Sequence, residues 1–261
     1  MIFDYHIHTK YSDGVATHQE IIDKAVALGV DEIGFSDHYG YYPNNWTTSR
    51  ELLSKMVEEV LLQKSKQDKI KVLLGLEVDF YPDRIEETKE VLSMYPFDYI
   101  MGSVHFINGD NFDSDPHHPI YSKYDINHLY ELYYENFVAA VRSGMFDTMS
   151  HPDLIKKYNY YPTKDFSTLY REVAKVLVEE GVMVEYNTSG YSRPCNDFFP
   201  SDEVTSIFLE EGVQFTIGSD SHKLDHLLRN YDLAKERLMG LGLTELHRYN
   251  SSPILLKNFI V

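Results

Sequence analysis

The sequence contains a single cysteine, Cys195, among 261 residues. One cysteine forms neither an internal disulfide nor a thiolate metal cluster, so any metal ion must be held by histidine and carboxylate groups. Long apolar runs are also missing, since stretches such as 72–74 and 254–256 are far too short to cross a bilayer. The N-terminus lacks the basic segment and apolar run of a signal peptide, so we expect a cytoplasmic protein.

Basic residues are scarce as well. Lysine and arginine number 24 against 41 aspartate and glutamate residues, a formal net charge of −17. Such a surface repels nucleic acid and anionic membranes, and we exclude both as main partners. A small anionic substrate would require local positive charge, for which bound metal ions are an obvious source.

Short apolar segments of β-type composition alternate with helical patterns along the chain. The expected strands cover residues 2–8, 32–36, 71–78, 98–105, 146–150, 182–187 and 213–219. The expected helices cover residues 17–28, 49–66, 85–93, 127–143, 167–180, 202–211 and 224–238. Glycines that directly follow four of these helices predict left-handed caps: Gly29, Gly144, Gly181 and Gly212. The alternation indicates a parallel sheet covered by helices.

Residues with ligand chemistry follow the strands. Periodicity alone leaves an open doubly wound sheet and a closed barrel as alternatives. All seven strands end in polar groups, namely His8, Asp37 with His38, Glu77, His105, His151, Asn187 and Asp220. A barrel brings these ends to one mouth, whereas an open sheet spreads them along an edge. We therefore expect a single-domain α/β protein over residues 1–261, a distorted (β/α)7 barrel closed by a strand-like or irregular segment at 250–261.

The candidate metal ligands carry only nitrogen and oxygen. His6 and His8 are alternate residues of one strand, so both imidazoles can face one ion. Two histidines at these positions could also lie on a half-exposed strand without binding a metal. The complete set of ligand-type residues at the strand ends does not fit that explanation. It comprises His6, His8, Asp13, His38, Glu77, His105, His151, Asp220 and His222. Such ligands suit zinc, manganese or iron, and their number suggests two or three divalent ions, two of which Glu77 can bridge.

Seven short motifs occur in a fixed order between His6 and His222. They are HxH, YSDG, SDH, GLEVDF, GSVH, SHPD and GSDSH. In this combination the sequence resembles the polymerase and histidinol phosphatase (PHP) family, which implies a distorted seven-unit barrel with a trinuclear metal centre. The DHYGYY and DPHHPIY segments are most similar to those of the histidinol-phosphate phosphatases of histidine biosynthesis. Hydrolysis of L-histidinol phosphate is the activity that this resemblance implies.

The resemblance also implies an assignment of the ligands. One metal would take His6, His8, Glu77 and Asp220, and a second would share Glu77 and take His105 and His151. A third would take Asp13, His38 and His222, with Asp13 in a position that is histidine in some members. Catalytic roles fall to Glu77, through the metal pair, and to Asp220 or His222 as the proton donor to the leaving group.

Positive charge beyond the metals is needed for a phosphate dianion. Arg193, in the loop after the sixth strand, is the leading candidate, because a guanidinium matches phosphate oxygens. Lys156 and Lys157 are weaker candidates that we expect to be solvated. Asn187 and Tyr39, the latter in a tyrosine-rich loop, are further candidate substrate contacts.

Other functions are weighed against the same motifs. The chain has neither a Cys-x5-Arg loop nor G-x-S-x-G, which excludes cysteine-type phosphatases and serine hydrolases. A phosphatase acting on a nucleotide or phosphotyrosine remains possible on this scaffold, as does an amidohydrolase-like enzyme that shares HxH. The GSDSH motif argues against the second. The intact ligand set argues against a metal-binding or interaction module without activity. The sequence does not specify an oligomeric state.

Overall fold

A parallel sheet forms the centre of the molecule. The computed structural model describes residues 1–42 and 44–259. Its main sheet runs in the order β1 (Phe3–Asp4), β2 (Glu32–Phe35), β4 (Lys71–Asp79), β5 (Tyr99–Ser103), β8 (Thr148–Met149), β9 (Met183–Asn187) and β10 (Phe215–Gly218). The short β3 (His38–Tyr39) also pairs with β4. All of these pairings are parallel.

The two edges of this sheet meet beyond β1 and β10. Ile7 and Ser221 form an isolated parallel bridge. The amide of His8 donates to the carbonyl of Ser221 at 2.8 Å, and the amide of Ser221 donates to the carbonyl of His6 at 2.9 Å. The sheet is thus nearly closed at its carboxyl end, which confirms the predicted barrel of seven strands.

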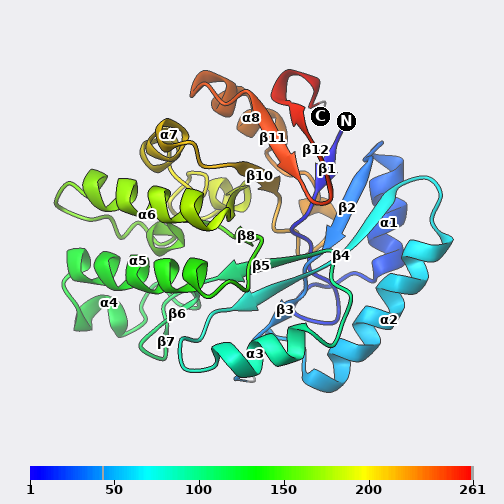
Figure 1. Cartoon of the computed structure of the whole chain (residues 1–261), viewed down its shortest axis with the longest axis horizontal. Coiled ribbons are helices and arrows are strands. Elements are labelled where there is room, and N and C mark those ends of the chain that lie inside the picture. The colour runs from blue at the N-terminus through cyan, green and yellow to red at the C-terminus, as the bar shows by residue number, and fades with distance from the viewer. Residues whose placement is uncertain (43, 260–261) are drawn as a thin grey trace.

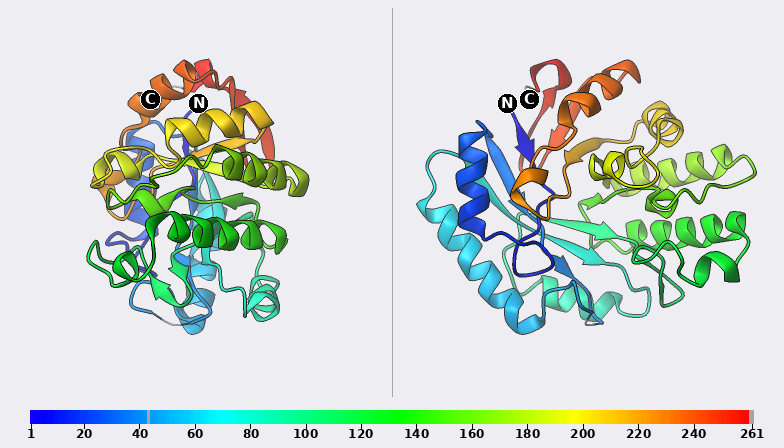
Figure 2. Two further views of the ribbon diagram at one scale, coloured as in Figure 1. Left: turned by 90° about the vertical axis from the view of Figure 1, so that its left-hand side faces the viewer. Right: turned by 180° about the vertical axis from the view of Figure 1, so that it is seen from behind.

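Helices surround the strands (Figures 1 and 2). They are α1 (His18–Ala27), α2 (Arg50–Lys66), α3 (Ile85–Leu92), α4 (Ile120–Lys123), α5 (Ile126–Arg142), α6 (Ser167–Glu180), α7 (Asp202–Glu211) and α8 (Tyr231–Gly240). Local signals fix several ends: Thr17 and Glu20 form a capping box at α1, and Gly181 and Gly212 adopt left-handed caps after α6 and α7. Gly29 and Gly144 also have positive φ, as predicted.

Two expected elements differ from the structure. The first strand pairs regularly only over Phe3–Asp4, because the Asp4 carboxylate, and not a neighbouring strand, accepts the backbone amides of His6 and Ser219 at 3.3 and 3.0 Å. The helix expected at 224–238 is wrong in its first half. A 3-10 turn, η3 (Leu224–His226), precedes two left-handed residues, Leu228 and Asn230, each at φ +59°, and α8 starts only afterwards.

Short elements in the loops were not expected. The hairpin of β6 (Phe106–Ile107) and β7 (Asp110–Asn111) follows β5, and helix α4 follows that hairpin. Further 3-10 turns are η1 (Leu154–Lys156), η2 (Ser189–Ser192) and η4 (Leu256–Asn258). Loops η1, η2 and η3 all follow carboxyl ends of strands, so they lie where a barrel places its functional site.

A C-terminal hairpin covers the opposite, amino end of the barrel. It consists of the antiparallel β11 (Glu245–Arg248) and β12 (Ser251–Leu255). Between them, the Tyr249 ring stacks on Tyr99 at 4.0 Å and its hydroxyl donates to Oγ1 of Thr148 at 2.7 Å. Arg248 pairs with Glu32 at 2.6 Å. Tyr99, Thr148 and Glu32 are each the first residue of a strand. The expected closing segment therefore packs against the amino end of the barrel and closes it, and we call it the plug.

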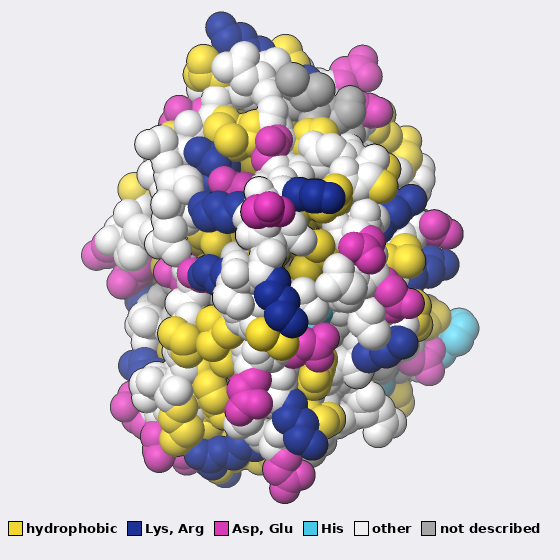
Figure 3. Space-filling model, turned by 90° about the vertical axis from the view of Figure 1, so that its right-hand side faces the viewer, with side chains coloured by type: hydrophobic (Ala, Val, Ile, Leu, Met, Phe, Trp, Pro, Cys, Tyr) yellow, Lys and Arg dark blue, Asp and Glu magenta, His cyan; other side chains and the backbone are white. Residues whose placement is uncertain are grey.

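The surface carries mixed charge on the face that includes α1 and α2. There, lysine and arginine side chains lie interspersed with acidic and neutral ones, and the described residues form no continuous basic area (Figure 3). This face offers no extended positive surface to a polyanion. None of the helices described here is long and apolar enough to cross a membrane.

Replacing Tyr249 with alanine should destabilise the fold. The change removes a buried aromatic ring and its hydrogen bond, so we expect a loss of about 3–5 kcal/mol in the free energy of unfolding. Tyr249→Phe keeps the ring and should cost about 1 kcal/mol. Denaturant unfolding measures both, with Leu255→Ala on the exposed side of β12 as the control. Equal effects of Tyr249→Ala and the control would refute the plug.

Candidate metal centre

Glu77, near the end of β4, lies at the middle of the candidate site. Its side chain is fully buried. Oε2 lies 3.0 Å from Nε2 of His6 and 3.4 Å from Nε2 of His8, and the same two nitrogens lie 3.9 and 3.4 Å from Oδ1 of Asp220. Ligand atoms bound to a tetrahedral zinc at about 2.0–2.1 Å are about 3.3–3.4 Å apart. The spacing of these four residues therefore suits one metal ion.

The second oxygen of Glu77 faces another pair of imidazoles. Oε1 lies 2.9 Å from Nε2 of His151 and 3.9 Å from Nε2 of His105. The hydroxyl of Ser103 donates to the same oxygen. Each carboxylate oxygen thus belongs to a different ligand group, which is the arrangement that a bridging carboxylate requires.

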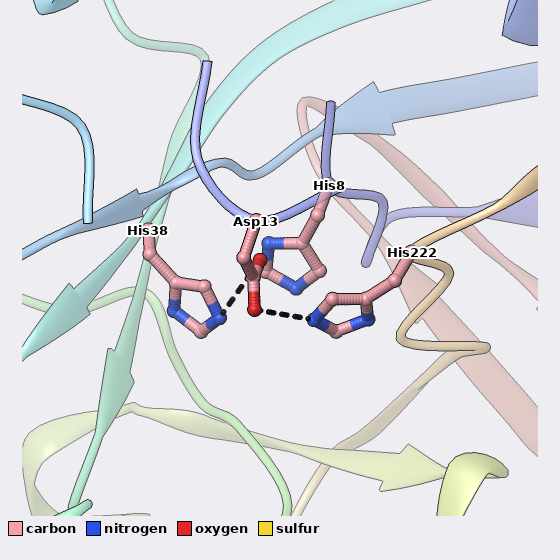
Figure 4. Close-up of side chains that lie close together, drawn as sticks. All are labelled: His8, Asp13, His38 and His222. Atoms are coloured by element: carbon pink, nitrogen blue, oxygen red, sulfur yellow. Dashed lines mark ion pairs between the residues drawn. The ribbon is translucent and has the colours of Figure 1, made fainter. Parts of the chain in front are cut away.

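A third group surrounds Asp13 (Figure 4). Its Oδ2 lies 3.2 Å from Nε2 of His222, and its Oδ1 lies 3.8 Å from Nε2 of His38. His8 joins the group, with its ring stacked on that of His38 at 4.2 Å. Overlapping sets of three or four residues, whose ligand atoms lie within 4.8 Å of one another, together include all nine predicted ligands.

The loop that carries Asp13 is held by Asp37. Oδ1 of Asp37 accepts hydrogen bonds from the Thr9 amide at 2.7 Å and the Ser12 hydroxyl at 2.6 Å. Asp37 is itself fully buried at the end of β2. The SDH motif therefore supplies a ligand candidate, His38, and a carboxylate that positions the loop of a second candidate, Asp13.

The chemistry of the donor set favours metal ions. Both ring nitrogens of His8 are buried, and neither makes a well-directed hydrogen bond to the described residues. A buried polar atom without a partner costs about 1–3 kcal/mol. A divalent ion bound at Nε2 of His8 would remove part of this cost, so these residues fit a metal.

Glu185 orients one side of the centre, and sequence reasoning missed it. Its Oε1 lies 2.7 Å from Nδ1 of His6, while Oε2 accepts hydrogen bonds from the His151 amide and from Nδ2 of Asn187, each at 2.9 Å. A carboxylate behind a histidine fixes its tautomer and directs the other nitrogen toward the metal. The sequence does carry one signal for Glu185. It stands two residues before Asn187 in the same strand, and alternate strand residues point to the same face.

Asp79 plays the same part for His105. Its Oδ1 lies 2.6 Å from Nδ1 of that histidine. Burial alone would lower the pKa of His105, but the charge and hydrogen bond of Asp79, together with the charges of Glu77 and Asp113, outweigh it and raise the pKa to about 9. Burial would likewise raise the pKa of Glu77, but His38 and His6 hold it well below its usual range. Burial dominates elsewhere: it lowers the pKa of His38 well below its usual value and raises the pKa of Asp79.

The backbone is strained at two of these ligands. His151 and Asp220 have φ of +24° and +51°, in the left-handed region that non-glycine residues rarely adopt. Arg229 holds the second turn: its Nε donates to the carbonyl of Ser219 at 2.9 Å and its Nη2 to that of Asp220 at 2.7 Å. No sequence motif pointed to Arg229, since the two carbonyls that it binds lie nine and ten residues before it in the chain.

A cavity of about 370 Å³ opens above the centre. Arg193 lines it, as predicted for a substrate contact, and so does Lys157, whose ammonium lies 2.6 Å from Oδ1 of Asp113. The cavity wall also includes Trp46 and Phe199. Metal ligands, two cations and aromatic rings therefore share one space.

The other proposed substrate contacts lie elsewhere. Asn187 is fully buried, and its amide contacts Glu185, so it supports the centre from behind. Tyr39 lines a separate cavity, together with Arg50 and Glu90 among others. The expectation that Lys156 and Lys157 are solvated is wrong.

Lys156 belongs to the protein interior. Its Nζ contacts Oδ2 of Asp153 at 2.9 Å, Oδ2 of Asp197 at 3.0 Å and the carbonyl of Phe198 at 2.6 Å. Only 2% of its side chain is exposed. These contacts occupy its donors, so it cannot reach a substrate phosphate.

Comparison with known proteins agrees with this geometry. Residues 4–189 match the PHP domain family. A probable histidinol-phosphatase of Deinococcus radiodurans is 30% identical over 225 residues, covering 84% of this chain and 86% of the relative. The histidinol-phosphatase of Lactococcus lactis is 25% identical over 258 residues, covering 96% and 95%.

A solved structure has the same fold. The crystal structure of the Lactococcus lactis histidinol phosphate phosphatase, complexed with zinc, L-histidinol and phosphate, superposes with a TM-score of 0.82. It is 23% identical and covers 95% of this chain and 96% of its own.

Fold and site together define a barrel protein with a divalent-metal centre at its carboxyl mouth. Within that class, the chain belongs to the PHP family. The resemblance seen in the motifs is thereby confirmed.

Glu185→Gln should weaken metal binding without unfolding the protein. The amide has the same size but only one acceptor oxygen, so either Nδ1 of His6 or the donors of His151 and Asn187 lose their acceptor. We expect about a 10–100-fold loss of metal affinity, measured by competition with a chelator. Glu180→Gln, at an exposed site on α6, is the matched control. Equal affinities in the two variants would exclude the orienting role.

Proposed function

We propose that the protein is a metal-dependent phosphomonoesterase that hydrolyses L-histidinol phosphate to L-histidinol and phosphate, a step of histidine biosynthesis. The observation that carries the proposal is the buried Glu77 carboxylate, whose two oxygens face separate imidazole groups. Relatives covering most of the chain are named as histidinol-phosphatases, which supports this substrate over nucleotides or phosphotyrosine.

The nine ligand candidates divide among two to three ions. His6, His8 and Asp220 share Oε2 of Glu77; His105 and His151 share Oε1; Asp13, His38 and His222 form the third set. Nitrogen and oxygen ligands favour zinc, manganese or iron. Divalent ions in such a site lower the pKa of coordinated water, orient the phosphate and neutralise its charge.

Protein groups supply the proton for the leaving alkoxide. His222 is 25% exposed in its side chain and lines the cavity, and its Nδ1 lies 3.3 Å from Oδ1 of Asp220. Both residues therefore face the cavity in which we place the substrate. We assign proton transfer to whichever of the two is not bound to a metal ion during the reaction.

Positive side chains and aromatic rings complete the substrate site. Arg193 forms no ion pair with a carboxylate among the described residues, so its guanidinium is available to a phosphate. Lys157 is oriented by Asp113 on the same wall. Trp46 and Phe199 offer apolar faces against which the imidazole of the substrate can pack.

Metal content tests the centre directly. The purified enzyme should contain two to three divalent ions per chain by elemental analysis. Glu77→Ala should release the two ions that share this carboxylate and abolish nearly all turnover. Glu179→Ala, on the exposed face of α6, should change neither quantity. A wild-type enzyme without metal that zinc or manganese does not activate would refute the proposal.

Substrate selectivity tests the assignment of the leaving group. The kcat/KM for L-histidinol phosphate should exceed that for p-nitrophenyl phosphate or AMP by at least about a hundredfold, a difference of roughly 2.7 kcal/mol in transition-state binding. Steady-state kinetics across this panel give the answer. A flat profile would leave a phosphatase but remove histidinol phosphate as its substrate.

Arg193→Ala should impair catalysis while the metals stay bound. Loss of one charge-assisted contact of roughly 1.5–3 kcal/mol should lower kcat/KM by about tenfold to a hundredfold or more. Elemental analysis of the same sample checks that the metal content is unchanged. Arg142→Ala, at the exposed end of α5, is the matched control. If Arg193→Ala matched it, the phosphate would be held without this residue.

A further inference from the structure

His226 lies at the rim of the metal centre but belongs to none of its ligand groups. It ends the 3-10 turn η3, four residues after His222, and lines the same cavity as Arg193 and Lys157. The sequence gives no reason to single it out, because it stands outside the GSDSH motif. Its neighbours nevertheless define its protonation state.

The contact with Arg229 fixes the tautomer of His226. Nη1 of Arg229 lies 3.3 Å from Nδ1 of His226. A guanidinium has five N–H donors and no acceptor, so Nδ1 must accept this hydrogen bond. A neutral imidazole carries one proton, which therefore sits on Nε2. Among the described residues Nε2 hydrogen-bonds to no protein atom, so its N–H remains available to a ligand in the cavity.

The electrostatic environment keeps this ring neutral. Burial, followed by the charge of Arg229, lowers the pKa of His226 to about 4. The charge of Arg193 acts in the same direction on both His226 and Arg229. In a chain of net charge −17, Arg193 and Arg229 form a local positive corner beside the candidate metal ligands, with the neutral ring of His226 next to them. An N–H donor in such a corner suits an anion.

Arg229 also connects this donor to the metal centre. The guanidinium that faces His226 binds the carbonyls of Ser219 and Asp220, and so holds the strained turn that presents the Asp220 carboxylate. One side chain thus fixes the distance between a metal-ligand candidate and the imidazole donor. The Asp220 carboxylate and the His226 imidazole are therefore already held in place before a phosphate binds.

We propose that His226 donates a hydrogen bond from Nε2–H to a phosphate oxygen of the substrate, and that Arg229 is the positioning residue that sets this tautomer. The proposal rests on the proposed phosphatase function. It adds a neutral donor to the cations and metal ligands already assigned, and it places η3 in the substrate site.

Binding of inorganic phosphate to the zinc-loaded protein tests the donor. His226→Phe keeps an aromatic ring but removes Nε2–H, and should weaken phosphate binding by about tenfold to a hundredfold in calorimetry. His226→Gln can place an amide N–H near the position of Nε2 and should recover most of the affinity. His247→Phe on β11, at the other end of the barrel, is the matched control. Wild-type affinity in His226→Phe would overturn the proposal.

The tautomer is tested by nitrogen-15 NMR of the histidine side chains. The His226 signal, assigned by its loss in His226→Gln, should show a protonated Nε2 and an unprotonated Nδ1. Arg229→Gln with its zinc retained should shift it toward a mixture of tautomers. A protonated Nδ1 in the wild type would overturn the inference. If the wild type leaves L-histidinol phosphate intact yet His226→Phe weakens phosphate binding, the substrate assignment fails and the donor stands.

Discussion

The buried carboxylate of Glu77 is the constraint on which the rest of the site depends. Removing an ionised carboxylate from water is costly unless charges or hydrogen-bond donors surround it. Here His6, His38 and His151 lie within 3.0 Å of its oxygens, and Ser103 donates to one of them. Those side chains come from four strand ends. Only a sheet that curves back toward itself brings so many ends to a single carboxylate.

Two further carboxylates orient the imidazole rings of the centre. Glu185 and Asp79 occupy the Nδ1 atoms of His6 and His105, which leaves each Nε2 pointing inward. The protein therefore concentrates negative charge behind its imidazoles as well as between them. On the proposed function, a phosphate would meet this negative charge together with the bound metals and the positive side chains of Arg193 and Arg229.

At the mouth of the barrel, strained backbone segments are held in place by hydrogen bonds with neighbouring side chains. Left-handed backbone at a non-glycine residue costs of order 1–3 kcal/mol, and His151 and Asp220 both adopt it. The first is held by the hydrogen bond from its amide to Glu185, and the second by the Arg229 guanidinium. Meanwhile the opposite end of the barrel is closed by aromatic packing around Tyr249. Stability is thus concentrated at one end and chemistry at the other.

The sequence by itself determined most strands and helices and marked nine candidate ligands, because both are recorded locally. Apolar strands, capping residues such as Thr17 and glycines after helices fix the elements, and each ligand follows its strand within a few residues. Interactions between distant segments were decided by the tertiary structure. Glu185, Arg229 and the burial of Lys156 depend on which loops meet in space, and no local pattern encodes that meeting. The same holds for His226, whose chemistry is set by a guanidinium and not by its neighbours in sequence.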